Sequence, residues 1–271
     1  MTDIDVAYLR EKNVAQLLES LAADIVTQKP SDPEAFLRSR FSTGEVGAIA
    51  RGEECRLHCF TLDPSCALAL IATSYARINL DYTEVDFDTQ AQLTPQFSRV
   101  NAFQRVPVLE HQGVVLLEPG SICRYLCHTT AAYPSSTRDR AKTDAAFEAI
   151  RCYLLPDVTA AVYEKVLNPR RLRRPCDPLG VAQAVDKVKA TLAAIGRQFF
   201  RESAWVVGRE FSIADMALAA CAFSMTQVVG ELLVFNEGTL QTWWAAAQNE
   251  RCVMDGLRGF ANAAAAQKAA R

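Results

Sequence analysis

The sequence predicts an α/β domain followed by an all-helical domain, with a short helical hairpin ahead of both. Between residues 55 and 130, the patterns follow the order strand, helix, strand, strand, strand, helix. From 131 to 271 apolar residues recur with helical spacing, and residues 1–45 show the same spacing on a smaller scale. Small, polar and glycine residues at 46–54 predict a linker between hairpin and body.

The composition of the chain excludes several classes of function. Half of the 271 residues are hydrophobic, 22% are charged and the net charge is −2, which argues against nucleic acid as a partner. No apolar run approaches the roughly 18 residues that cross a membrane, and the first residues lack the apolar core of a secretory signal. We therefore expect a cytoplasmic globular protein.

The cysteines do not predict a metal site or a disulfide framework. There are nine of them, an odd number, and their spacing is irregular. Cys55 and Cys59, and Cys123 and Cys127, are four positions apart, but the whole chain has only three histidines. We expect reduced thiols and no metal.

The first 45 residues predict two short amphipathic helices. The first ends at Lys29-Pro30-Ser31, and Asp32 can cap a second helix that has Pro33 at its first position. Helices this short need a partner, most simply a second copy of the hairpin. Their apolar positions are Val14, Leu17, Leu18, Leu21, Ile25, Phe36 and Leu37.

The α/β domain begins with a strand at 56–61, a helix at 66–76 and a strand at 81–87. Apolar runs at 106–109 and 114–117 surround a short turn, as in a hairpin. The proline of Val106-Pro107 heads the first run, a position typical of a cis peptide bond. Glu118 and Pro119 then lead into a helix at 122–126, whose first N–H groups would suit a carboxylate.

The helical domain is predicted from four periodic segments, at 143–166, 181–200, 213–229 and 239–248. The Ala-rich tail at 260–270 is either a further helix or a frayed end. Ser212 and Asp215 have the spacing of a capping box at the start of the third segment. Between the first two lies a segment with Arg170, Arg171, Arg173 and Arg174. It is either a solvated loop or a patch for an acidic partner.

The body resembles glutathione transferases of the beta and theta type. The resemblance rests on the order of elements, on VPVLE at 106–110, and on LLE and ICRYL at 116–118 and 122–126. WVVGREFSIAD at 205–215 is similar to a motif of that family's helical domain, so the resemblance covers about 55–271. It implies a thioredoxin-like α/β domain followed by the all-α transferase domain.

The resemblance implies a glutathione site with two candidate activating residues. DPSCALA at 63–69 is similar to a bacterial pattern in which Cys66 is the matching cysteine. Ser65 offers a hydroxyl, although the serine of serine-using classes falls nearer Asp63, and Cys66 is alternatively one more buried thiol. Residues implied to bind glutathione are Arg105, Val106, Pro107, Glu118 and Pro119.

Pro119 departs from the family's pattern. The family usually has serine or glycine there, whose backbone N–H binds the γ-glutamyl carboxylate, and proline has no N–H. Losing such a charge-assisted hydrogen bond costs about 1.5 to 3 kcal/mol, so binding would be weaker.

Residues 1–45 resemble the RII-alpha dimerisation and docking domain, in its Dumpy-thirty-like branch. The matching segment is KPSDPEAFL at 29–37, preceded by Tyr8-Leu9 and the apolar positions of the first helix. The resemblance implies a homodimer that binds the amphipathic helix of an anchoring protein. It also implies a cilium or flagellum, at an axonemal assembly such as a radial spoke. The alternative is a hairpin packed on its own domain.

The sequence supports two functions. We expect a dimeric docking scaffold with a transferase-like body; the alternative is an active glutathione transferase tethered by its docking segment. A disulfide oxidoreductase is disfavoured because no CxxC motif includes Cys66, since residue 63 is Asp and residue 69 is Ala.

Overall fold

The structure is a computed structural model, and it describes residues 22, 23, 25–27, 29, 32, 33, 55–200, 204–231 and 238–269. The backbone contacts divide the chain into two compact units, residues 1–49 and 50–271. The α/β and helical parts of the body therefore belong to one unit.

The first unit contains the end of one helix and the start of another. Residues 22, 23 and 25–27 are helical, and the Lys29 N–H donates to the Ile25 carbonyl at 2.8 Å. Lys29 then adopts a left-handed conformation with φ 43°, and Pro33 is helical again. Of the residues predicted to form the docking surface, Ile25 is described and is half-buried, and the other six lie outside the described residues.

The sheet of the second unit has four strands in the order β2-β1-β3-β4. The strands are β1 (Cys55–Cys59), β2 (Asp81–Glu84), β3 (Val108–His111) and β4 (Val114–Leu117). β1 pairs with β2 in parallel and with β3 antiparallel, and β3 pairs antiparallel with β4. Gln112 and Gly113 both have positive φ, which is the geometry of a tight hairpin turn. The sheet confirms the predicted order of elements.

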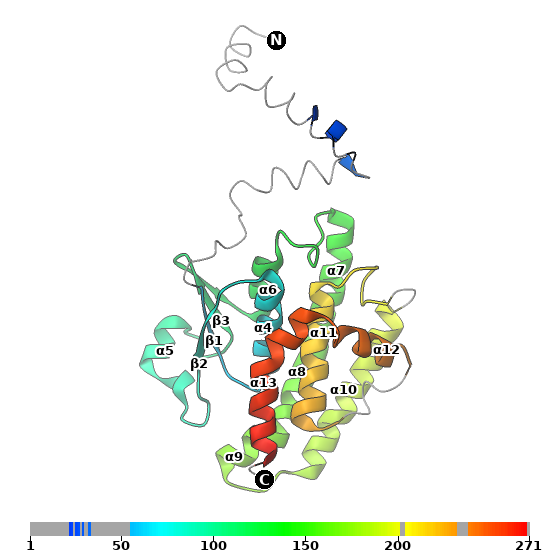
Figure 1. The fold of residues 1–271 in the computed structure, drawn as a ribbon. Coiled ribbons are helices and arrows are strands. Elements are labelled where there is room, and N and C mark those ends of the chain that lie inside the picture. The colour runs from blue at the N-terminus through cyan, green and yellow to red at the C-terminus, as the bar shows by residue number, and fades with distance from the viewer. Residues whose placement is uncertain are drawn as a thin grey trace. The chain divides into compact units, whose positions relative to one another are not determined.

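Helices cover both faces of this sheet (Figure 1). α5 (Pro95–Val100) lies on one face, where Phe97 packs with Val85 and Val108. α4 (Pro64–Ala76) and α6 (Pro119–Cys127) pack together on the other. A short 3-10 turn, η1 (Ala91–Leu93), precedes α5.

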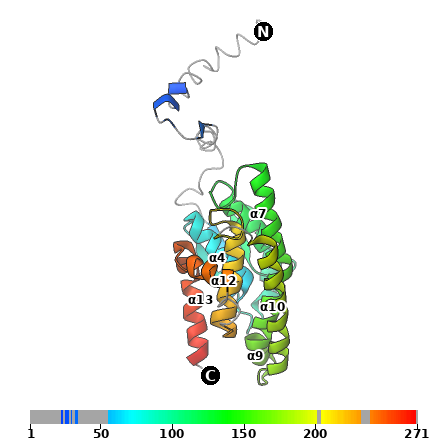
Figure 2. The ribbon, with the colours of Figure 1, turned by 90° about the vertical axis from the view of Figure 1, so that its right-hand side faces the viewer.

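The helical part follows α6 and forms a layer beside α4. Its first continuous run comprises α7 (Thr137–Ala149), η2 (Ile150–Leu154), α8 (Leu155–Val162), η3 (Tyr163–Leu167) and α9 (Asn168–Leu172). The others are α10 (Pro178–Phe199), α11 (Ile213–Phe223), η4 (Ser224–Val229), α12 (Gly238–Ala247) and α13 (Arg251–Ala269). α13 lies at one side of α11 and α10 at the other (Figures 1 and 2).

The long helical run from α7 to α9 contains a π-helical turn just before Pro156. Proline has no N–H for the carbonyl four residues earlier, so the α-helical ladder breaks there. The structure accommodates this with a π-helical turn, in which the Leu155 N–H reaches back to the Ile150 carbonyl. Such turns are frequent at functional sites, and Arg151 lies within this one.

Some predicted boundaries were wrong. The first strand ends at Cys59 instead of Thr61, the second at Glu84 instead of Phe87, and the strand after Pro107 begins at Val108. α4 and α6 begin earlier than predicted, because Pro64 and Pro119 occupy their first turns, where no N–H is required. The expected arginine loop is helical at Arg170 and Arg171, and Arg170 pairs with Asp88 at 2.5 Å.

α11 is the core of the helical layer, since every one of its residues is buried. The predicted capping box is confirmed: the Asp215 carboxylate accepts from the backbone N–H of Ser212 at 2.9 Å. The same carboxylate accepts from the Val206 N–H at 2.8 Å and the Trp243 indole at 2.9 Å. It therefore joins the preceding loop, α11 and α12.

We predict that Asp215→Ala lowers the free energy of unfolding of the full chain by at least about 3 kcal/mol, because it leaves several buried donors without an acceptor. Tryptophan fluorescence during urea unfolding measures this. Asp255→Ala is the matched control, because its pairs with Arg251 and Arg258 are exposed, and such pairs contribute at most about 1 kcal/mol. Equal effects of the two substitutions would contradict the prediction.

Candidate functional site

A cavity of about 900 Å³ lies where the sheet part meets the helical part. The α/β part contributes the start of α4, the segment before β3 and the start of α6. The helical part contributes residues of η2, α8, η3 and α9, among them Arg151, Tyr163 and Arg171. The cavity is large enough for a ligand of tripeptide size.

The cavity brings together most of the site residues predicted from the sequence. These are Ser65, Arg105, Val106, Pro107, Glu118 and Pro119. The Val106-Pro107 peptide bond is cis, as predicted. Val106 precedes the β1–β3 ladder, which starts at Val108, so the peptide groups of Val106 lie outside that pairing. Cys66 is not among the residues that line the cavity.

Glu118 has a backbone conformation that residues other than glycine rarely adopt. Its φ is 69° and its ψ is 132°, in the position just before α6. Such a conformation costs about 1 to 3 kcal/mol and persists only where the surroundings fix it, which is common at binding sites. The result is a carboxylate presented to the cavity at the start of a helix.

Asp63 occupies the start of α4, where the first helical N–H groups converge. Its Oδ1 accepts from the N–H of Ser65 at 2.8 Å and of Cys66 at 3.3 Å. The side chain is 6% exposed and lines the cavity. Burial raises the pKa of Asp63 to about 6, and the two N–H bonds limit that rise.

This geometry changes the prediction for the activating residue. We expected free N–H groups at this helix start to stabilise a thiolate, but the Asp63 carboxylate already accepts from them. Cys66 is fully buried, and burial together with its hydrogen bond to Cys59 raises the pKa of its thiol. A buried thiol with a raised pKa is a poor nucleophile. Ser65 remains a candidate because it is half-buried at the cavity wall.

Two residues of the helical part that line the cavity, Arg151 and Tyr163, were missed by sequence reasoning, because each lies within a helical segment whose period gives no sign of a site. Arg171, which the sequence predicts in a solvated loop or a patch for an acidic partner, also lines the cavity. Burial, followed by the nearby Asp63 carboxylate, raises the pKa of Tyr163 to about 12, so it stays a neutral phenol. The position of Asp63 at the start of a helix could have been predicted, since Asp-Pro-Ser is a typical helix start.

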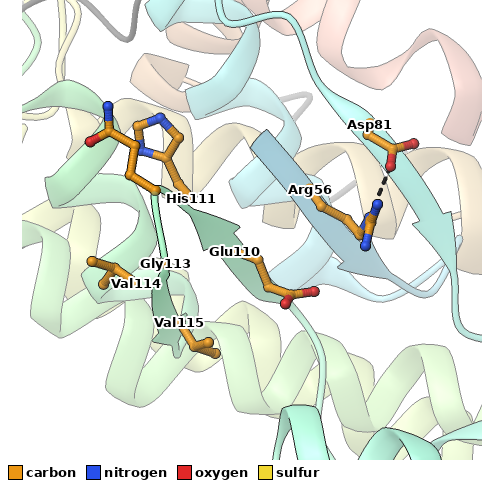
Figure 3. Close-up of a pocket in the computed structure, with 8 residues that line it drawn as sticks. Arg56, Asp81, Glu110, His111, Gly113, Val114 and Val115 are labelled. Atoms are coloured by element: carbon orange, nitrogen blue, oxygen red, sulfur yellow. Dashed lines mark hydrogen bonds and ion pairs between the residues drawn. The ribbon is translucent and has the colours of Figure 1, made fainter. Parts of the chain in front are cut away.

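A second cavity, of about 450 Å³, lies at the β3–β4 turn (Figure 3). Arg56 and Asp81 on its wall form an ion pair of 2.9 Å with each other. Val114 and Val115 form another part of the wall, and both are about half exposed. It contains none of the predicted site residues, so the larger cavity is the better candidate.

The described residues contain no group of three or more histidine, cysteine or acidic side chains placed to hold a metal ion. Within the same residues, no helix combines the length and apolar character needed to cross a membrane.

Comparisons with known proteins relate the body to one family. Residues 57–128 match the glutathione S-transferase N-terminal domain. Mouse glutathione S-transferase theta-1 is 27% identical over 194 residues, which are 69% of this chain and 80% of that protein. Mouse theta-3 is 29% identical over 129 residues, where the match covers 46% of this chain and about half, 54%, of that protein.

Solved structures share the fold. Apo human glutathione S-transferase T1-1 has a TM-score of 0.68 at 22% identity, with 78% of this chain and 90% of that chain covered. Poplar glutathione transferase F1 has a TM-score of 0.69 at 18% identity, with 77% and 99% covered. The body is therefore glutathione-S-transferase-like, with a thioredoxin-like domain followed by a helical domain.

Proposed function

We propose that the body binds glutathione in the 900 Å³ cavity and acts as a glutathione transferase. One observation carries the proposal: the segment before β3, the start of α6 and the start of α4 meet at one cavity. The similarity to theta transferases supports the same ligand. This function was the alternative in the sequence analysis, and it is preferred here because the described site belongs to the body.

The charges that line the cavity suit this ligand. Glutathione carries two carboxylates and one ammonium at neutral pH, and the cavity wall contains Arg105, Arg151, Arg171, Glu118 and Glu164 in addition to Asp63. We propose that Arg105, beside Val106, binds one carboxylate and that Glu118 binds the ammonium. Each charge of the ligand thus has a partner of opposite sign on the wall.

Asp63 is proposed as the base that activates the thiol. In the step, the S–H bond breaks, the proton moves to the Asp63 carboxylate, and the sulfur electron pair forms a bond to an electrophilic carbon. The leaving group departs from that carbon with its bonding electrons. A carboxylate would repel a thiolate, so Asp63 acts by accepting the proton and not by stabilising the anion. A base with a pKa near 6 is mostly ionised at neutral pH.

The test combines binding with turnover. The full chain should bind reduced glutathione and S-methylglutathione with a Kd below about a millimolar in calorimetry. Asp63→Asn should lower kcat/KM for an activated aryl chloride by about a hundredfold or more. Because asparagine is as good a helix cap as aspartate, α4 should stay intact and the Kd for S-methylglutathione should change little.

The pH dependence has a defined direction. The base must be ionised to accept the proton, so kcat/KM should fall as the pH drops below about 6, where Asp63 becomes protonated. Cys66→Ala is the matched control and should retain activity. Activity lost in Cys66→Ala and retained in Asp63→Asn would assign the activation to Cys66, and absence of binding would refute the function.

A docking role for the first unit is the second candidate. It is supported by the helical residues 22, 23 and 25–27, the left-handed Lys29 and the helical Pro33, which follow the predicted helix, stop and helix. We propose that this unit dimerises, binds the amphipathic helix of an anchoring protein and tethers the body to an assembly. An axonemal location, and an acidic partner for Arg170, Arg171, Arg173 and Arg174, belong to this proposal.

We predict that Leu17→Glu with Leu21→Glu makes a peptide of residues 1–45 monomeric, while the unchanged peptide self-associates. Charges within the predicted apolar stripe would have to be buried in the dimer, which is strongly unfavourable. Sedimentation equilibrium measures the mass. Val26→Glu is the control, because Val26 is 70% exposed and outside the stripe, and it should leave association unchanged. A monomeric unchanged peptide would contradict the dimer.

A further inference from the structure

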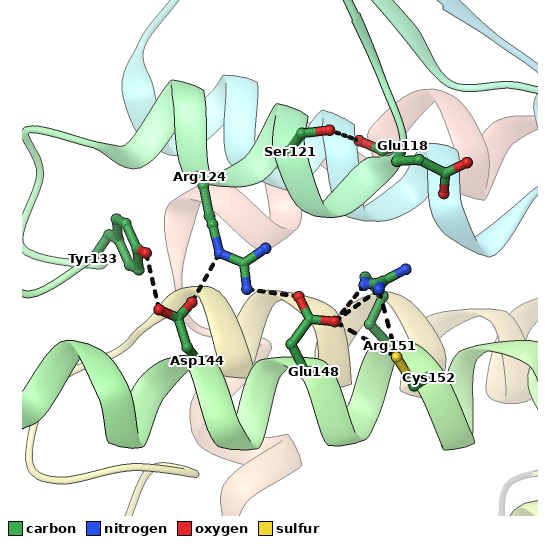
Figure 4. A network of polar contacts seen from close by, with 8 residues as sticks. All are labelled: Glu118, Ser121, Arg124, Tyr133, Asp144, Glu148, Arg151 and Cys152. Carbon is green, nitrogen blue, oxygen red and sulfur yellow. Dashed lines mark hydrogen bonds and ion pairs between the residues drawn. The ribbon is translucent and has the colours of Figure 1, made fainter.

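Two opposite charges from different parts of the body lie at one end of the cavity. Glu118 precedes α6, and Arg151 belongs to the π-helical turn of the helical part. Both line the cavity. Figure 4 shows Arg151 on the long helix below, across from the start of α6 and Glu118.

The start of α6 lacks one donor that a helix normally offers. Pro119 is at its first position and has no N–H, and the Ile122 N–H is already bonded to the Glu118 carbonyl at 3.1 Å. A carboxylate bound here would therefore meet only the N–H groups of Gly120 and Ser121, and a charged donor would have to come from another element. Arg151 of the helical part lies close to this helix start, next to Gly120.

Gly120 allows Arg151 to cross this helix start closely. A Cβ atom at Gly120 would lie 3.0 Å from Cδ and 3.2 Å from Nε of Arg151. These separations are tighter than normal contacts, so a side chain at 120 would displace the guanidinium. The glycine and the arginine thus form one arrangement, although they are 31 positions apart.

Glu148 holds Arg151 in a fixed orientation. Its Oε2 accepts from Nε of Arg151 at 2.8 Å and lies 2.7 Å from Nη2. Its Oε1 accepts from Arg124 at 2.6 Å, so one carboxylate is shared by two guanidinium groups (Figure 4). Among the described residues, no hydrogen-bond acceptor is found for Nη1 of Arg151. Arg151 is therefore held in place with donors and charge left for a ligand.

We propose that Arg151 and Glu118 together recognise the amino-acid zwitterion of a γ-glutamyl ligand, with Arg151 binding the carboxylate and Glu118 the ammonium. This proposal rests on the proposed function and names the residue that replaces the missing donor of Pro119. An arginine suits a carboxylate because its planar donors can bind both oxygens. Requiring both charges in one group would favour γ-glutamyl peptides over simple carboxylic acids.

The experiment compares two ligands on the full chain. One is S-methylglutathione, and the other is the same peptide with 4-aminobutanoyl in place of γ-glutamyl, which lacks only the α-carboxylate. In calorimetry the unchanged protein should prefer S-methylglutathione by roughly ten- to a hundredfold. Arg151→Met should bind S-methylglutathione at least about tenfold more weakly and lose most of this preference, while its affinity for the second peptide stays within about threefold.

Two further variants separate recognition from folding. Arg140→Met is the matched control, because Arg140 donates to the Pro134 carbonyl and does not line the cavity, so the preference should survive. Gly120→Ala should reduce the preference by displacing Arg151 without removing its charge, and so provides a second test if Arg151→Met fails to fold. A full preference in Arg151→Met or in Gly120→Ala would overturn the proposal. Failure of the unchanged protein to bind either peptide would instead refute the proposed function.

Discussion

The hydrogen bonds of the buried Asp63 carboxylate with the start of α4 determine what chemistry the cavity can perform. Asp63 accepts from two of the first N–H groups of the helix that connects β1 with β2. This fixes where α4 begins and places a negative charge at the wall of the cavity. A second anion beside it would be repelled, so the site favours proton transfer to the carboxylate over stabilisation of a thiolate.

The cavity exists only because the two parts of the body pack against each other. The residues that line it include Val106 and Glu118 of the sheet part, and Arg151 and Tyr163 of the helical part. Arg151 lies in the π-helical turn before Pro156, and the Asp215 carboxylate joins α11 to the neighbouring loop and to α12. The packing of the helical layer therefore determines where Arg151 lies relative to the sheet part.

The structure changes the interpretation of Pro119. The sequence alone predicts that Pro119 removes a hydrogen-bond donor from the carboxylate-binding site, which suggests a weakened or lost function. In the structure it starts α6 without cost, because the first helical position does not need an N–H. Beside it Gly120 leaves room for Arg151, so a charged side chain is available where a backbone group is missing.

Local patterns in the sequence predict the order of strands and helices, the cis peptide bond at Pro107, the capping box at Ser212 and the likeness to glutathione transferases. These features depend on local patterns: alternation, helical period, proline and capping residues within a few positions. The sequence also placed Arg105, Val106, Glu118 and Pro119 in one site, through that likeness. Strand ends were predicted less well, since Thr61 and Phe87 fit a strand by composition but have no pairing partner in the register.

Which groups face the cavity depends on the tertiary packing. Cys66 is buried against Cys59, whereas Asp63, only three positions before Cys66, lies at the wall of the cavity. The packing also brought Arg151 across Gly120, a contact between segments that have no shared pattern in the sequence. Burial and long-range contacts depend on how the helices and the sheet pack, so the local spacing of residues predicts neither of them.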